Sequence, residues 1–112
     1  MSLLSIIIAA LVITSNAFAH TIDGVWKHAT KPALIEFNLT AGTASVKEHQ
    51  IHKQNAGLTV IKNILPSTEH EWTGQMFNGY KNEYESVTIQ LNGNSLSVFD
   101  AENSEVLKLY RD

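Results

Sequence analysis

The sequence predicts an all-β protein, a small eight-stranded antiparallel up-and-down barrel that follows a cleaved signal peptide. Apolar and polar residues alternate with a period of two over almost all of the chain after residue 19. Residues that favour turns recur about every ten positions, as they do in all-β domains. No strongly helical segment remains to cover an open sheet. Closure into a barrel, which removes exposed sheet edges, is therefore favoured over a sandwich.

Residues 1–19 have the pattern of a secretory signal peptide. The apolar run from Leu3 to Ile13 is too short for a stable membrane-spanning helix. It precedes Ala17-Phe18-Ala19, the small-x-small pattern of a cleavage site. The leader has no Lys or Arg, so an N-terminal anchor or a buried core helix is the alternative. Cleavage predicts a single domain over residues 20–112, exported to the periplasm or secreted, with no membrane span.

The composition excludes several classes of protein. The net charge of −3 is spread along the chain, which argues against a nucleic-acid partner and against a polybasic membrane-binding surface. The absence of cysteine excludes disulfides and favours a bacterial periplasm. The chain has no nucleophile elbow, phosphate loop or paired zinc-binding histidine motif. The sequence therefore predicts a non-enzymatic protein with no catalytic residues and no cofactor, and it leaves the oligomeric state open.

Turn residues separate the eight predicted strands. Asn78-Gly79 and Asn92-Gly93 supply the positive φ angles of tight hairpins. Pro66 is expected to end the fourth strand, because proline donates no ladder hydrogen bond. Short connections favour antiparallel neighbours in chain order. The predicted strands are 22–28, 33–39, 43–50, 58–65, 69–77, 83–91, 95–99 and 105–111.

Strand parity predicts a structural floor for the barrel, formed by Gly24, Trp26 and Arg111. Trp26 shares its face with inward-pointing Ile22, and Arg111 shares its face with inward-pointing Leu109. If the first and last strands meet, the guanidinium group can stack on the indole ring. In the alternative, Trp26 is ordinary core and Arg111 is a solvated terminal residue.

Several short motifs follow one another at the intervals of a known family. They are Gly24-Val25-Trp26, Gly57-Leu58-Thr59-Val60-Ile61-Lys62, Trp72-Thr73-Gly74, Tyr84, Val87 to Leu91 and Leu96-Ser97-Val98. On these motifs the chain resembles the bacterial periplasmic domain-of-unknown-function family 2147. The resemblance implies a lipocalin-like (calycin-type) periplasmic barrel, without catalytic residues to transfer. The chain departs from that family's pattern at residues 77–81, and at residues 107–111, where only the arginine is kept.

An aromatic cluster is the main candidate for ligand binding. Trp72, Phe77, Tyr80 and Tyr84 surround the predicted fifth and sixth strands. At a barrel mouth, such rings could hold a small apolar or amphipathic molecule, or an envelope component. In the alternative, Trp72 belongs to the core and the tyrosines cover the outer wall. The protein would then be a structural or interaction protein with a filled barrel.

The histidines raise the question of a metal site. Cleavage after Ala19 would leave His20 as the mature N-terminus, where its amine and imidazole could bind copper. His49 and His52 are three residues apart, so on a strand they would point to opposite faces, whereas in a turn they could share a metal. Without further ligands at a suitable spacing, no metal site is assigned. Copper binding through His20 is kept as an alternative function.

Overall fold

A computed structural model describes residues 21–111, so the predicted leader and His20 lie outside the described residues. Eight antiparallel strands form a closed barrel in chain order, which confirms the predicted fold class. A short 3-10 turn, η2 (Lys53–Asn55), interrupts the third connection. The strands are β1 (Gly24–His28), β2 (Ala33–Asn38), β3 (Thr43–His49), β4 (Thr59–Thr68), β5 (Glu71–Asn78), β6 (Glu83–Asn92), β7 (Ser95–Phe99) and β8 (Glu105–Tyr110).

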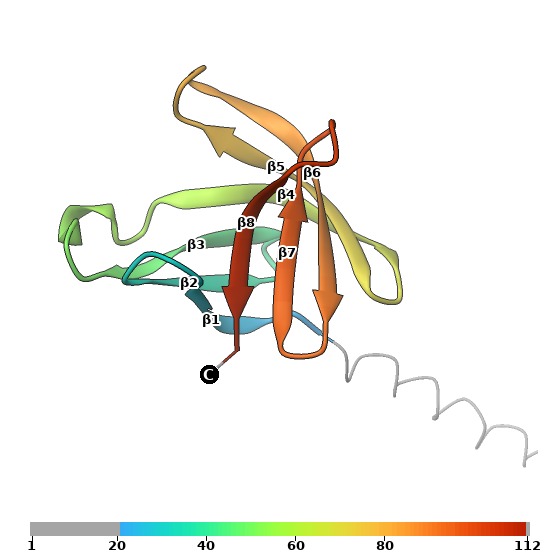
Figure 1. Cartoon of the computed structure of the whole chain (residues 1–112), viewed down its shortest axis with the longest axis horizontal. Coiled ribbons are helices and arrows are strands. Elements are labelled where there is room, and N and C mark those ends of the chain that lie inside the picture. The colour runs from blue at the N-terminus through green and yellow to red at the C-terminus, as the bar shows by residue number, and fades with distance from the viewer. Residues whose placement is uncertain (1–20, 112) are drawn as a thin grey trace, which may run out of the picture.

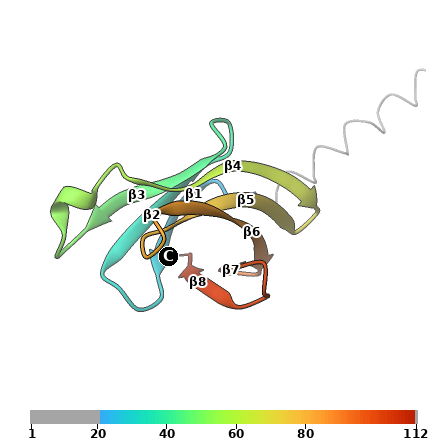
Figure 2. The same ribbon diagram turned by 90° about the horizontal axis from the view of Figure 1, so that it is seen from above.

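The barrel closes where β1 pairs with β8, Lys27 opposite Tyr110 and His28 opposite Leu109. Figures 1 and 2 show the ring of strands from two directions. Because neighbouring strands are antiparallel, the connections alternate between the two ends of the barrel. The β2–β3, β4–β5 and β6–β7 turns lie with residues 21 and 111 at the end that we call the terminal end. The β1–β2, β3–β4, β5–β6 and β7–β8 connections form the opposite end, the loop end.

Alternation along the strands places one face of the sheet in the core. In β2, Ala33, Ile35 and Phe37 are buried and the residues between them are not. The core side chains lie inside the barrel, and toward the terminal end Trp26 and Leu96 have no exposed area. The main cluster consists of Ile22, Trp26, Ile35, Phe37, Ala44, Ile61, Ile64, Trp72, Val87, Ile89, Leu96, Val98, Leu107 and Leu109.

The fourth strand differs from its prediction. Pro66 does not end it, because β4 continues to Thr68 with Pro66 opposite Trp72. The physical reason is that β3 pairs with β4 only at Ala44 and Ser45. Pro66 therefore lies on a stretch with one partner strand, where proline is tolerated. Within residues 21–111, no helix has the length and apolar character needed to cross a bilayer.

Candidate functional site

The structure brings Trp26 and Arg111 together at the terminal end. The Arg111 guanidinium carbon lies 4.0 Å from the centre of the indole ring. Its Nη1 donates to the Asp23 carbonyl oxygen at 3.0 Å, and its Nη2 donates to the Thr21 carbonyl oxygen at 2.9 Å. The Trp26 Nε1–H donates to the Ile22 carbonyl oxygen at 2.9 Å. One arginine thus ties the end of the chain to the segment that leads into β1.

Gly24 supplies the backbone conformation of this arrangement. Its φ of 108° lies in a region that side chains rarely adopt. A Cβ atom placed there would stand 3.5 Å from Arg111 Nη1. The preceding residue, Asp23, is fixed from the other side, because its Oδ1 accepts a 2.7 Å hydrogen bond from the Leu39 backbone N–H. The contacts of this cluster hold the residues before β1 against Arg111 after β8.

The four aromatic residues of the predicted cluster do not converge. Trp72 is buried in the core, at the start of β5 near the terminal end. Phe77 and Tyr84 lie opposite each other near the far end of the β5–β6 hairpin, on the face turned away from the core. Their rings make an edge-to-face contact with centroids 5.4 Å apart. The prediction of one aromatic site at the mouth therefore separates into a core residue and an outer pair.

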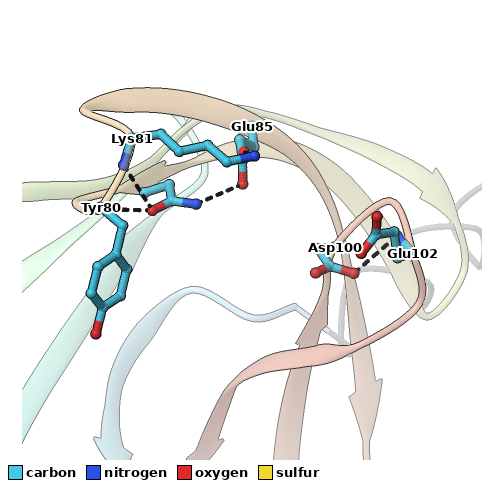
Figure 3. A network of polar contacts seen from close by, with 6 residues as sticks. Tyr80, Lys81, Glu85, Asp100 and Glu102 are labelled. Carbon is cyan, nitrogen blue, oxygen red and sulfur yellow. Dashed lines mark hydrogen bonds and ion pairs between the residues drawn. The ribbon is translucent and has the colours of Figure 1, made fainter.

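Tyr80 occupies the tip of the hairpin. Its side chain is completely exposed and points away from the neighbouring network in Figure 3. The tip itself is ordered by Asn78, whose Oδ1 accepts the backbone N–H groups of Tyr80 and Lys81. Asn78 Nδ2 and Lys81 Nζ both bond the Glu85 carboxylate, each at 3.1 Å. These bonds lower the pKa of Glu85 and keep it charged.

A polar groove lies beside the outer aromatic pair. It is a hollow of about 420 Å³. Thr73, Gln75, Ser86 and Thr88 pair across β5 and β6 on the same face as Phe77 and Tyr84. All four are uncharged, and each can both donate and accept hydrogen bonds. The lining residues are Asn63, Thr73, Gly74, Gln75, Ser86, Val87, Thr88, Asp100 and Ala101.

Two amides organise the groove. Asn63 Nδ2 donates to Gln75 Oε1 at 2.7 Å. Within the described part of the chain, this bond leaves the Gln75 amino group and the Asn63 carbonyl oxygen for a ligand. Beside them, Lys62 places its Nζ 4.0 Å from the centre of the Tyr84 ring. The period-two pattern could have identified Gln75 and Ser86 as outward-facing. Asn63 could not be identified in this way, because it adopts a positive φ of 54° in an irregular stretch of β4 that no sequence pattern indicated.

The histidines at the loop end act as acceptors for backbone groups. His28 Nδ1 accepts the N–H groups of Thr30 and Lys31, each at 3.1 Å. His49 Nδ1 accepts those of Ile51 and His52 in the same way. His49 ends β3 and its ring centroid lies 4.9 Å from that of His52. The turn geometry considered from sequence is therefore the one present. Over residues 21–111, however, no group of three or more potential ligands is arranged to hold a metal ion.

The folding stability should fall in acid through His28. Burial, then Lys31 and His49, lower the pKa of His28 below its ordinary 6.5. Folding then favours the neutral ring, whose Nδ1 can accept. The contribution is complete above pH 6.5, and it is lost progressively as the pH falls toward the lowered pKa. Urea unfolding from about pH 8 to about pH 5 measures it.

A matched variant isolates this effect. In His28→Asn the side-chain oxygen can accept the same backbone N–H groups, but it does not titrate. The variant should therefore show a smaller loss of stability in acid than the parent. Equal pH dependence in the two proteins would show that His28 is not responsible.

Comparison with family models, with curated proteins and with solved structures finds no match to this chain.

Proposed function

We propose that the protein is an exported, non-enzymatic binding protein. Its ligand is a neutral, hydroxyl-rich molecule, such as a segment of an envelope polysaccharide, held on the outer face of the β5–β6 hairpin. The observation that carries this proposal is the groove of about 420 Å³, which is lined mainly by uncharged hydroxyl and amide groups and lies beside an exposed aromatic ring.

The filled barrel supports an outer site. Core side chains occupy the interior, including Trp72, which was one of the four expected ligand contacts. The outer face is therefore the place that we propose for the ligand. The groove has a volume within the usual range of small-molecule sites, about 300–1,000 Å³.

The chemistry of the groove supports a neutral polar ligand. Hydroxyl and amide side chains match the alternating donors and acceptors of a sugar. Asp100 is the one charged lining residue, and its Oδ1 already accepts the backbone N–H groups of Glu102 and Ser104. Phe77, 40% exposed at the end of the same face, offers apolar ring surface to the C–H groups of a sugar ring.

Titration with neutral oligosaccharides tests the proposal. Maltotetraose and chitotetraose are added to the isotopically labelled protein, and amide chemical shifts are followed by NMR. We expect shifts confined to Thr73, Gln75, Ser86 and Thr88 and their neighbours. Gln75→Ala should weaken binding by about three- to tenfold, the effect of losing one hydrogen bond.

Two controls make the outcome decisive. Val106→Ala removes an exposed apolar side chain on β8, outside the groove, and should leave the titration unchanged. An apolar fluorescent probe tests the alternative of a hydrophobic mouth. If the sugars leave the groove unshifted while the probe binds at the loop end, the proposed ligand class is wrong.

A further inference from the structure

The loop end carries opposite charges on its two halves. We define the basic half as residues 28–32 and 47–58, in the β1–β2 and β3–β4 connections. It contains three lysines and three histidines against a single glutamate. The acidic half, residues 78–85 and 100–105, contains five carboxylates against one lysine. The order of strands around the barrel places each half on one side of the rim.

The charges within each half are close enough to interact. On the basic half, Lys31 and His49 both act on His28. On the acidic half, Glu83 and Glu102 act on Lys81, and Asp100 acts on Glu85. Figure 3 shows Lys81 and Glu85 on the hairpin facing the loop that carries Asp100 and Glu102. Lys81 neutralises only part of this acidic group, so a net negative field remains.

A surface divided in this way is complementary to itself. A two-fold axis along the boundary between the halves would place the basic half of one copy on the acidic half of another. Both contacts form at once, as in the isologous interfaces of cyclic dimers. A partner protein with one sign of charge would match only half of the rim and would be repelled by the rest.

Exposed apolar side chains occupy both halves. Ile51 and Leu58 are 68% and 56% exposed on the basic half. Tyr80 stands fully exposed on the acidic half, at the tip of the hairpin. The same two-fold axis brings Tyr80 of one copy toward the side that carries Ile51 and Leu58 in the other. An aromatic anchor surrounded by complementary charges is typical of protein interfaces.

We propose that the loop end is a self-association surface, through which two copies of the chain form a two-fold dimer, rim against rim. The interaction leaves the outer face of the β5–β6 hairpin uncovered near Thr73 and Thr88. The loop that carries Asp100 and Ala101 belongs both to the groove and to the acidic half, so the two proposed contacts meet there. The dimer would present two grooves to one extended polymer.

Charge reversal with mixing provides the test. Lys47→Glu with Lys53→Glu makes the whole rim acidic. Glu83→Lys with Glu102→Lys leaves three carboxylates and three lysines on the acidic half, which removes its net negative charge. These four side chains make no ion pair within the described residues. Sedimentation of the protein, purified in the processed form that the cell produces, should show the parent as a dimer at low salt. Each variant alone should be monomeric, and an equimolar mixture should form a one-to-one heterodimer.

Salt supplies a second measurement. The Debye length shortens from about 30 Å at 0.01 M to about 3 Å at 1 M salt. The dissociation constant of the dimer should therefore rise at least about tenfold over that range. Tyr80→Ser should weaken the dimer at every salt concentration, because the tyrosine contact is apolar. Circular dichroism of each variant verifies that it is folded.

Two results would overturn the proposal. One is a parent protein that stays monomeric at low salt and high protein concentration. The other is a parent dimer that both charge-reversed variants retain, because the interface would then lie elsewhere on the barrel.

Discussion

Replacing Trp26 with alanine should lower the free energy of unfolding by about 3–5 kcal/mol, the usual cost of removing a large aromatic side chain from a core. The indole is fully buried, stacks under Arg111 and donates to the Ile22 carbonyl oxygen. A domain of this size has about 5–10 kcal/mol of stability, so the loss would be a large share of it. Urea unfolding at neutral pH measures the change.

Two further substitutions separate the causes. Trp26→Phe keeps most of the apolar volume and loses the N–H donor, so it should cost less than Trp26→Ala. Phe77→Ala removes an aromatic ring from the outer surface and should cost little by comparison. If Trp26→Ala unfolded at the same urea concentration as the parent, the terminal end would not depend on this residue.

Replacing Arg111 with alanine should lower the free energy of unfolding by roughly 2 kcal/mol. The estimate combines a stacking contact worth about 0.5–2 kcal/mol with two charge-assisted hydrogen bonds, reduced because Arg111 is partly exposed to solvent. The loss has a topological cause as well. β1 and β8 pair at only two positions, and Arg111 supplies the next contact along the seam where the barrel closes.

The control for this prediction is Arg111→Lys. Lysine keeps the positive charge but cannot reach both carbonyl oxygens with a planar fork or stack on the indole in the same way. It should therefore recover less than half of the loss. Full recovery by lysine would show that charge alone accounts for the effect of Arg111.

The alternation of the sequence was sufficient to predict the class of fold. Val87, Ile89 and Leu91 point toward the core and Ser86, Thr88 and Gln90 point away, as the period of two requires. Turn chemistry predicted the β6–β7 hairpin, where Gly93 has a positive φ of 64°. For the β5–β6 hairpin the predicted positions were wrong, because the positive φ of that longer turn lies at Asn82 (55°) and not at Asn78 or Gly79. The end of β4 could not be predicted, because proline excludes a strand only where neighbours lie on both sides. The number of neighbours at Pro66 depends on where β3 begins, at Thr43.

The candidate site was less predictable than the fold. Parity alone led to the pairing of Trp26 with Arg111, because both belong to strands that must meet if the barrel closes. Parity could also have separated Trp72 from Phe77, because the two are five residues apart on one strand and an odd separation places side chains on opposite faces. The four aromatic residues are close together in the sequence, and that closeness favoured a single site although parity did not.

The sequence by itself determined the period-two alternation, the approximate places of the turns and which face of each strand is apolar. These features depend on residues near one another in the chain. The sequence also predicted that the first and last strands pair, because a closed barrel requires them to meet. Only the tertiary structure decided which polar side chains share a groove and how the loop charges divide around the rim. Those properties depend on strand register and on irregular positions such as Asn63, which are set by packing between distant segments.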